Sequence, residues 1–597
     1  MRRLPLLTLL LIFATALPSM AQDHSVDFNP AGISFAQGRS WTHTLFGQQP
    51  ITVAPISLAN SSRLQGLLRG GKLYLSLNDA IALALENNLD IAIERFNLPI
   101  ADTGILQAKS GASPGGVSTG ISSGTPGGGA GGGGGAVAAV NGGGPAVPNL
   151  DPTFSTNFSI ADNVQPPGHS TLGSSSFNSQ AALQSHNTLA DFSFNKGFVT
   201  GGTVSLGYSN TRSSSSVFAP QISSGISFSF TQPLLQGFGI ELNTRNIVTA
   251  KDDRELADIA FSQQVMSTVA QIEDLYWNDV TANQAVRNAQ ESVDYAQTTL
   301  NNTQRQVEVG TMAPLQTTQA KATLATSQQA LIAAQNTLEY DALLLKNAVT
   351  KNMADPTLAD ADVVTTDSLN VVPNEPILPA SDLVKLALQY RPELAETRIN
   401  MSISEMNIKA SKDLLKPTLN LIGGYNANSV QPTYGSTFGD VFAGNFPSYS
   451  VGFNLQIPLT NHSGQASVAR AQLQMQQAHL QQQQQINNIV ISVEQARFTL
   501  ESSRAQVLAA GQAVTFNRET VDADQKRLEL GATTLTQVLL DQSNLTAANA
   551  NLVTAESTYA QAKVSLEQLT GRTLAANRIS ILDAENGKVT QMPQANF

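Results

Sequence analysis

Residue types that could perform chemistry are few in this sequence, and they do not fall in the spacings that chemistry requires. The six histidines are scattered, at His24, His43, His169, His186, His462 and His479. None stands in an HExxH pattern, and the sequence has neither a GxSxG nucleophile elbow nor a Walker phosphate loop. Cysteine is absent, which excludes thiolate ligands and disulfides. We therefore predict no enzyme, no cofactor and no metal site.

Two pairs of adjacent acidic residues, Asp252–Asp253 and Glu273–Asp274, lie within a long helical pattern. Their expected role is that of solvated or capping charges. Charged residues make up only 13% of the chain, against the usual ~25%. The net charge of −11 argues against a nucleic-acid partner.

Two ladders of apolar residues, each with a spacing of seven, dominate the pattern of the chain. The first ladder is Val286, Val293, Leu300 and Val307, and it recurs 221 positions later as Val507, Val514, Val521 and Leu528. The second is Leu324, Leu331, Leu338 and Leu345, and it recurs as Leu545, Leu552, Tyr559 and Leu566. Apolar residues at this spacing form a seam for a supercoiled partner helix. A glycine between the ladders, Gly310 and then Gly531, marks a reversal. The chain is therefore predicted to contain two duplicated antiparallel helical hairpins.

The duplication predicts how the chain is divided. The predicted parts are a signal peptide (1–21), an N-terminal extension (22–72), a first repeat (73–354), a linker (355–379), a second repeat (380–572) and a C-terminal tail (573–597). The first repeat contains a Gly-rich insert (111–149), a β-segment (150–235) and a helical hairpin (243–354). The second contains a β-segment (417–460) and a hairpin (463–572). The Gly-rich insert lacks a phosphate-binding pattern and is predicted to be a flexible low-complexity segment.

The N-terminus has the features of a secretory signal. Arg2 and Arg3 precede an apolar stretch, and Ser19-Met20-Ala21 places small residues where cleavage is expected. No later stretch is long and apolar enough for a transmembrane helix. The protein is predicted to be exported, with the mature chain starting near Gln22.

Strict alternation of apolar and polar residues predicts β-strands. It appears at Thr153–Ile160, Val204–Tyr208, Gly225–Thr231, in the strand opened by Pro417, and at Val451–Leu459. Extra β-sequence at about 161–223 is predicted to form a hairpin turned at Gly201-Gly202. We expect its two strands to extend the sheet outside the membrane rather than to enlarge a barrel.

Helix ends are predicted from capping residues and periodicity. One helix is expected over Leu77–Phe96 with Asn78 as its cap, and another is expected to be capped by Ser381. The first helix of each hairpin should end near Glu308 and Glu529. At ~1.5 Å per residue each would be roughly 100 Å long.

With the repeat laid out, the chain resembles the TolC family of outer-membrane efflux channels. The resemblance covers roughly residues 73–572. It rests on the duplicated element order, on Phe230-Thr231-Gln232-Pro233-Leu234-Leu235, on Tyr390-Arg391-Pro392-Glu393-Leu394, and on the two reversal sequences. It implies an α+β membrane protein in which a long α-helical coiled-coil barrel of duplicated hairpins is fused to a trimeric outer-membrane β-barrel. Each protomer would give four strands to that barrel.

The resemblance also implies partners and site residues. A homotrimer in outer-membrane lipid would serve as the exit duct of a tripartite efflux or type I secretion system, docked onto a periplasmic adaptor and an inner-membrane transporter. The docking tips would be Val309-Gly310-Thr311 and Leu530-Gly531-Ala532. The alternative for each glycine is that it only permits the turn.

Well-known family members carry acidic residues at a periplasmic constriction just beyond the tips. The matching positions here are Gln316, Gln319, Gln537 and Leu540, none of which is ionisable. Asp541 lies one residue further on. It is in line with Val538, Ala548, Ala555 and Ala562, so we expect it to face a neighbouring helix. The sequence therefore predicts a neutral constriction.

Two other functional classes are compatible with long helical hairpins. A periplasmic adaptor also carries one, but two hairpins, each preceded by a strand pair, disfavour that class. A coiled-coil surface protein does not account for the alternating strands tied to each hairpin.

Overall fold

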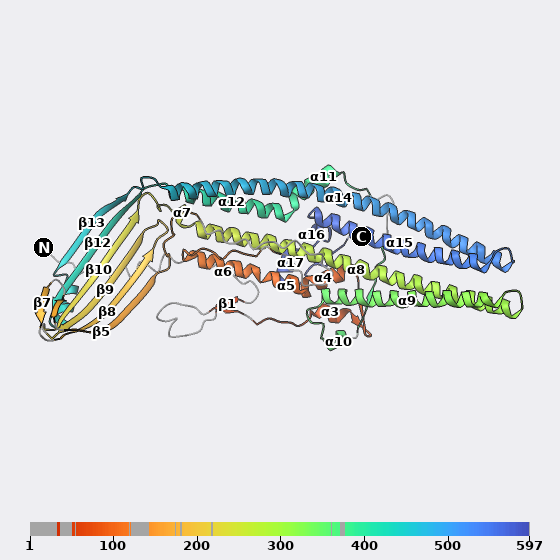
Figure 1. Ribbon diagram of the computed structural model, residues 1–597, viewed down its shortest axis with the longest axis horizontal. Coiled ribbons are helices and arrows are strands. Elements are labelled where there is room, and N and C mark those ends of the chain that lie inside the picture. The colour runs from red at the N-terminus through yellow and green to blue at the C-terminus, as the bar shows by residue number, and fades with distance from the viewer. Residues whose placement is uncertain are drawn as a thin grey trace.

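The protein is elongated, with a β-sheet at one end and two long helical hairpins at the other (Figure 1). The computed structural model describes residues 33–35, 51–53, 55–118, 120, 143–166, 168–172, 175–179, 182–216, 219–359, 361–369 and 376–595. The predicted signal peptide and its cleavage site lie outside these residues.

The two hairpins follow the heptad ladders. The first consists of α8 (Arg245–Glu308) and α9 (Pro314–Val349), and the second consists of α14 (His462–Glu529) and α15 (Leu535–Leu569). The predicted ends at Glu308 and Glu529 are confirmed. With 64 and 68 residues, α8 and α14 are each roughly 100 Å long.

The helix predicted over Leu77–Phe96 is interrupted. The chain forms α4 (Leu77–Asn87), α5 (Leu89–Arg95) and α6 (Asn97–Lys109). Asn88 breaks the first of these, because its side chain caps α5 by accepting from the Asp90 and Ile91 amides and also donates to the Ala348 carbonyl at 3.0 Å. The predicted Asn78 cap is wrong, since Ser76 caps α4.

The corresponding segment of the second repeat forms α11 (Ala380–Tyr390) and α12 (Pro392–Asp413). The predicted Ser381 cap is also wrong: Ser381 lies within α11, and Pro379 occupies the capping position. The helix breaks before Pro392 because proline disfavours helical backbone in the residue preceding it. Arg391, at this break, pairs with Glu393 at 2.8 Å.

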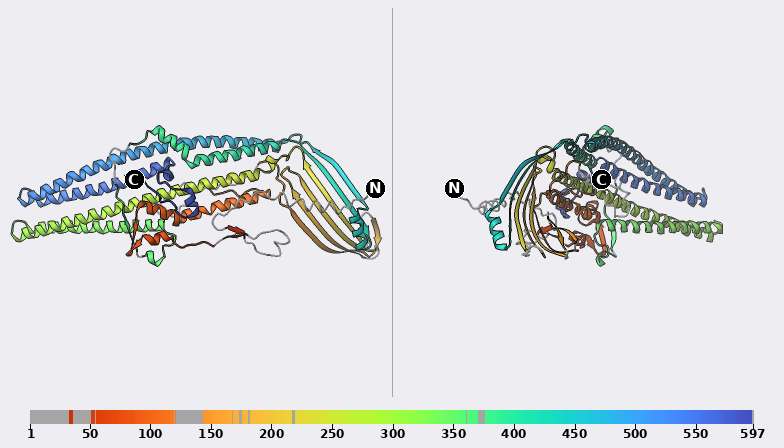
Figure 2. Two further views of the ribbon diagram at one scale, coloured as in Figure 1. Left: turned by 180° about the vertical axis from the view of Figure 1, so that it is seen from behind. Right: turned by 60° about the vertical axis from the view of Figure 1, so that its left-hand side comes forward.

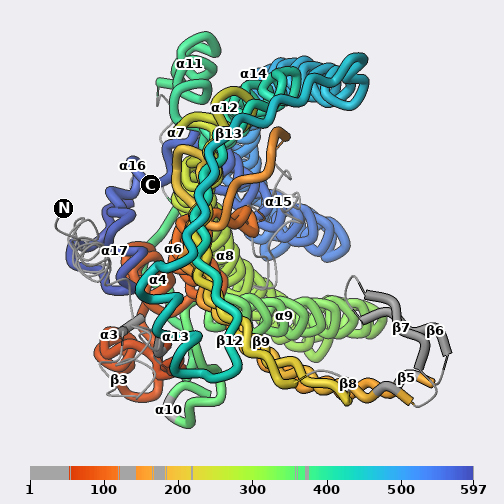
Figure 3. The backbone as a smooth tube through the Cα atoms, turned by 90° about the vertical axis from the view of Figure 1, so that its left-hand side faces the viewer, coloured from red at the N-terminus to blue at the C-terminus, as the bar shows by residue number. Residues whose placement is uncertain are grey.

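Six strands form one antiparallel sheet in the order β13-β12-β10-β9-β8-β5. They are β5 (Thr153–Gln165), β8 (Leu183–Gly197), β9 (Thr203–Ser215), β10 (Gln221–Pro233), β12 (Thr418–Gln431) and β13 (Pro447–Gln456). The predicted strands are therefore confirmed, although β13 ends before Ile457 and Leu459. The sheet is curved when viewed along the long axis of the molecule (Figure 3).

The extra hairpin lies inside this sheet. β8 and β9 pair around the predicted turn, where Gly201 has φ +89°. They stand between β5 and β10 and are as long as those strands. They are therefore interior strands of the sheet, in line with the other four, which alternation alone could not predict because it identifies a strand but not its neighbours. A further pair, β6 (Gly168–Leu172) and β7 (Ser175–Ser179), forms a separate ribbon.

The strand register gives the whole sheet one apolar and one polar face. One row that crosses all six strands is Phe154, Phe194, Leu206, Phe228, Tyr425 and Tyr449. The next row, on the opposite face, is Ser155, Ser193, Gly207, Ser227, Asn426 and Ser448. Successive residues of a strand point to opposite faces, so β8 and β9 share the sidedness of the other four strands.

The middle of the molecule is a compact body around α8 (Figure 2). It contains α3 (Ser62–Leu67), β3 (Leu68–Arg69), β4 (Lys72–Leu75), α10 (Pro356–Ala359), β11 (Asp362–Thr365), α16 (Thr573–Ala576) and α17 (Ile581–Asn586). Three further short segments are β1 (Ile33–Phe35), β2 (Ile51–Val53) and α7 (Ile240–Asn243), and α7 lies where the chain passes from the sheet into α8 (Figure 1).

Three segments predicted to be an extension, a linker and a tail contribute to this body. In the extension, Arg63 forms a 3.2 Å ion pair with Glu86 of α4. β4, where the first repeat begins, pairs in parallel with β11 of the linker. The linker is also held by Asp367, which accepts a 2.8 Å hydrogen bond from the buried Tyr276 hydroxyl. In the tail, the Ala584 carbonyl accepts from Arg95, and the Ala595 amide donates to Asn78.

Candidate functional site

The two hairpin tips share one backbone geometry. At the first tip, Gly310 has φ +81°, its amide bonds to the Val307 carbonyl at 3.0 Å, and the Thr311 amide bonds to the Gln306 carbonyl at 2.8 Å. This pair of bonds around a left-handed residue is a Schellman motif, which terminates a helix and satisfies its last carbonyls. Pro314 then begins α9, where its missing N–H costs nothing.

The second tip repeats this pattern. Gly531 has φ +71°, its amide bonds to Leu528, and the Ala532 amide bonds to Arg527 at 2.8 Å. The Thr534 side chain caps α15 by accepting from the Gln537 amide. Both glycines are therefore required by the turn, whatever else the tips do.

Each tip presents one large apolar side chain to solvent. Val309 is 78% exposed and Leu530 is 83% exposed. Neither residue is strained, since both have ordinary right-handed helical φ values of −77° and −84°. Burying them against another surface would remove apolar area from water, so these two side chains are the clearest contact points on the tips.

The four predicted constriction residues lie on the first turns of α9 and α15. Gln319, Gln537 and Leu540 are exposed, whereas Gln316 is half-buried. In the isolated chain they project from two separate helices. A ring would therefore form only between hairpins and between copies of the chain.

Asp541 faces a neighbouring helix, as predicted. It is 6% exposed and belongs to the buried stripe of α15 that includes Val538 and Ala548. Its carboxyl lies against that of Asp524 on α14 and accepts a 3.0 Å hydrogen bond from Gln537. Burial, and then the neighbouring Asp524 carboxyl, raise the pKa of Asp541 above its ordinary value.

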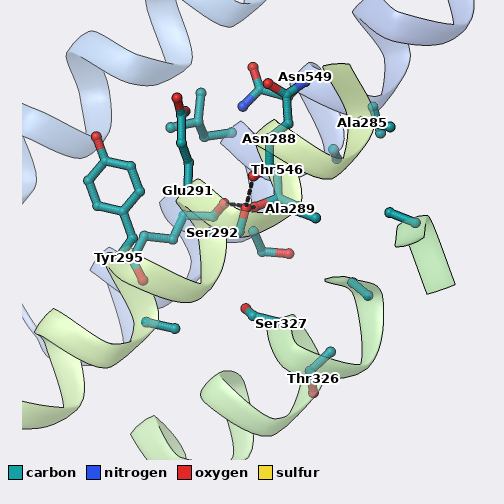
Figure 4. Close-up of a pocket in the computed structure, with 18 of the residues that line it drawn as sticks. Ala285, Asn288, Ala289, Glu291, Ser292, Tyr295, Thr326, Ser327, Thr546 and Asn549 are labelled. Carbon is teal, nitrogen blue, oxygen red and sulfur yellow. Dashed lines mark hydrogen bonds between the residues drawn. The ribbon is translucent and has the colours of Figure 1, made fainter. Parts of the chain in front are cut away.

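The two hairpins meet at an open cavity of about 580 Å³ that is lined largely by Ala, Ser, Thr and Asn side chains (Figure 4). Ser292 of α8 and Thr546 of α15 bridge the two hairpins at 3.1 Å, and Gln542 donates to Thr299 at 3.0 Å. The sequence pattern did not identify these contacts. The only signal is the run of Ala, Ser and Thr residues at positions that lie between the heptad ladders.

The acidic pairs of α8 are not the solvated charges that the sequence suggested. Asp253 is 5% exposed and Glu273 is fully buried, as is Asp279. The cause is tertiary: this part of α8 is covered by α4–α6 and by the C-terminal segment. Asn577 of that segment donates to the Glu273 carboxyl at 2.5 Å. Burial, and then the nearby Glu567 carboxylate, raise the pKa of Glu273 to about 8.

Glu273→Gln should stabilise the protein at alkaline pH. The folded chain holds a proton on Glu273 that the unfolded chain releases near the ordinary pKa of 4.5. The free energy of unfolding therefore falls as pH rises from about 4.5 to about 8. Glutamine keeps the oxygen that accepts from Asn577. Because it does not titrate, it removes this pH-dependent loss in the free energy of unfolding, which is on the order of 3–5 kcal/mol above pH 8. Thermal unfolding measured at pH 5 and pH 8.5 tests this.

The matched control is Glu291→Gln on the same helix, where Glu291 is exposed and lies 3.8 Å from Arg518. This change should alter the free energy of unfolding by less than about 0.5 kcal/mol at both pH values. An unchanged pH dependence in Glu273→Gln would refute the buried proton.

Among the described residues, no three or more His, Asp or Glu side chains are grouped so that they could hold a metal ion. Over the same part of the chain, none of the helices combines the length and hydrophobicity that crossing a bilayer requires.

Comparison with known proteins identifies relatives of this chain. A family profile described as outer membrane efflux protein matches residues 201–349 and 383–572. The outer membrane efflux protein BepC of Brucella suis biovar 1 is 27% identical over 186 residues, which are 31% of this chain and 40% of BepC. The outer membrane protein TolC of Vibrio cholerae serotype O1 is 25% identical over 194 residues, which are 32% of this chain and 43% of TolC. Each match spans less than half of the relative's length.

Solved structures match over most of the chain. The CmeC outer membrane channel of Campylobacter jejuni has a TM-score of 0.57 at 14% identity, with 90% of this chain and 98% of CmeC covered. The open MtrE outer membrane channel of Neisseria gonorrhoeae has a TM-score of 0.52 at 15% identity, with 83% and 89% covered. These similarities establish a common fold. Together with the profile match over both repeats, they show that this chain belongs to the outer membrane efflux protein family.

Proposed function

We propose that this protein is the outer-membrane exit duct of a tripartite efflux or type I secretion system. Three copies would close a β-barrel in outer-membrane lipid and a helical tunnel in the periplasm. The tunnel would receive substrate from an inner-membrane transporter through a periplasmic adaptor. The duct would conduct passively.

The observation that carries this proposal is the two-sided, open-edged sheet. Its apolar row and its Ser/Gly/Asn row run without interruption over all six strands, as lipid on one side and a wet lumen on the other require. Within the described part of the chain, the outermost strands, β5 and β13, each have one unpaired edge. Unpaired strand edges are not tolerated in lipid, and six strands are fewer than the eight of the smallest membrane barrels. Closure therefore requires further copies.

Three copies of a six-stranded sheet make a barrel of eighteen strands. All six strands have 10 to 15 residues, which meets the ~9–11 residues that a tilted membrane strand needs. Barrel diameter grows roughly linearly with strand number. The family resemblance implied four strands per copy. A barrel of six strands per copy would be about half again as wide as that.

The helical end of each protomer would reach the partners. Helices of roughly 100 Å carry the tips, Val309-Gly310-Thr311 and Leu530-Gly531-Ala532, far from the sheet (Figure 1). We propose these tips as the adaptor-docking surface. The uncharged side chains just beyond them, Gln316, Gln319, Gln537 and Leu540, would line the periplasmic constriction.

We expect the mature protein to fractionate with the outer membrane and to run as a trimer in native mass spectrometry of detergent-solubilised material. Cryo-electron microscopy of that trimer should show eighteen strands. Recovery as a soluble periplasmic monomer would refute the proposed duct. A trimer with twelve membrane strands would refute only the assignment of β8 and β9 to the barrel.

A further inference from the structure

A short helix on the outer end of the sheet has no role in the duct described above. After β12 the chain forms α13 (Tyr434–Ala443), which turns back over the sheet instead of leading directly into β13. Figure 3 shows α13 on the convex side of the curved sheet, away from α9 and α15. In a closed barrel, the convex side is the outer side.

α13 is fixed to the apolar face of the sheet. The Phe438 ring lies 5.6 Å from that of Tyr208 on β9. Asp440 accepts hydrogen bonds from Ser429 at 3.1 Å and from Gln431 at 2.9 Å, both on β12. Thr437, on the inner side of the helix, is fully buried. The position of α13 is therefore determined by contacts with two strands.

One flank of α13, next to its buried inner side, is aromatic and uncharged. We define the aromatic patch as Tyr434, Phe438 and Phe442 of α13 together with Phe446, which follows the helix; they are 48%, 41%, 54% and 61% exposed. The rings of Phe438 and Phe442 are nearly parallel, at 4°, with centroids 6.0 Å apart. The only charged residue of α13 is Asp440, and its hydrogen bonds direct it towards β12.

On β12, which lies beneath α13, the apolar face ends too early to match a membrane on its own. On β12 it runs from Leu419 to Ala427, and the same face then continues as Ser429 and Gln431. At ~3.3 Å per residue this stretch is roughly 26 Å long, or about 20 Å along the membrane normal at the usual strand tilt. Outer-membrane barrels present a band of about 25 Å.

α13 covers the polar continuation of that face. Ser224 of β10 and Ser429 of β12 are 1% and 3% exposed, because the helix lies over them. The aromatic patch is presented to the surroundings in their place. A helix with its side chains is about 10 Å across, which is enough to make up the missing ~5 Å of the band.

We infer that α13 is an interfacial helix whose aromatic patch is embedded in the outer membrane, at the boundary between acyl chains and headgroups of the outer leaflet. This inference rests on the proposed function, since it takes the apolar face of the sheet as lipid-facing. The patch continues that face without a break. Aromatic side chains are favoured at this depth of the membrane because they combine an apolar ring with tolerance of water.

Single-cysteine spin labelling tests the inference directly, because the chain has no native cysteine. The full-length trimer carrying Phe442→Cys is reconstituted in phosphatidylcholine/phosphatidylglycerol vesicles, and collisions of the label with oxygen and with a water-soluble nickel chelate are measured. Phe453→Cys on β13, 70% exposed, is the lipid reference, and Val309→Cys at a tip is the water reference. Tyr434→Cys provides a second probe on α13.

We expect the oxygen-to-nickel collision ratio at Phe442 and Tyr434 to be severalfold above that at Val309 and below that at Phe453. A ratio equal to that of Val309 would place the patch in water and overturn the inference. Low access to both reagents would mean that a neighbouring protomer covers the patch, which also overturns it. If the label at Phe453 is itself in water, the assignment of the apolar face of the sheet to lipid is refuted, and the proposed duct is refuted with it.

Discussion

Replacing Val309 and Leu530 together by aspartate should lower export by more than about tenfold, since two exposed apolar contacts worth ~1–2 kcal/mol each are lost from every protomer. The reason lies in the tips: these are the large apolar side chains that each reversal exposes, at 78% and 83%. An aspartate there would lose water on docking without gaining a partner. Export by intact cells and in vivo cross-linking to the adaptor are the two measurements.

The same substitutions should leave trimer assembly and the unfolding temperature unchanged, because both residues have ordinary helical backbone angles. Replacing Gly310 and Gly531 by tryptophan is a less specific test, since φ values of +81° and +71° strain any bulky residue. Gly310→Asn with Gly531→Asn is the better control for a change at the tips that keeps the turn, because asparagine tolerates the left-handed region. Normal export and cross-linking in the double aspartate variant would refute docking through the tips.

Divalent and trivalent cations should block the unmodified channel only weakly, whereas Leu540→Asp should create strong block. Leu540 is 54% exposed near the tip, so three aspartates at this position would add fixed negative charge to the proposed ring. Coulomb attraction of a cation depends on such charge. Single-channel conductance in a planar bilayer, titrated with Mg²⁺ and then with a lanthanide ion, measures the effect.

The contacts of Asp541 determine the choice of variants. Gln537→Asp should also increase block by cations. However, it removes the amide that donates a hydrogen bond to Asp541, and it places a third carboxyl beside Asp524 and Asp541. Leu540→Asp is therefore the cleaner change. Asp541→Asn should have little effect on block, because that side chain is 6% exposed. Strong block of the unmodified channel that Asp541→Asn abolishes would show that Asp541 lines the pore.

Several features of the fold were predictable because they depend on short-range pattern. The heptad ladders predicted both hairpins and the helix ends at Glu308 and Glu529. Alternation predicted the strands, including the hairpin at Gly201-Gly202, and the glycine at each reversal predicted the tips. The stripe containing Asp541 correctly placed that carboxyl against a neighbouring helix. Each of these features follows from a periodicity that one element imposes on its own residues.

Other features depended on which segments meet in space, and only the tertiary structure decided them. Glu273 looked like a solvated helix charge, yet it is buried because Asn577 and the C-terminal segment fold back onto α8. β8 and β9 carry the right alternation for a strand in any sheet, but only their register with β5 and β10 places them within the apolar row that crosses all six strands. The sequence alone therefore determined the repeated hairpins and the two-sided strands. The tertiary structure decided the width of the sheet and the burial of the acidic residues, because both are set by contacts between residues far apart in the chain.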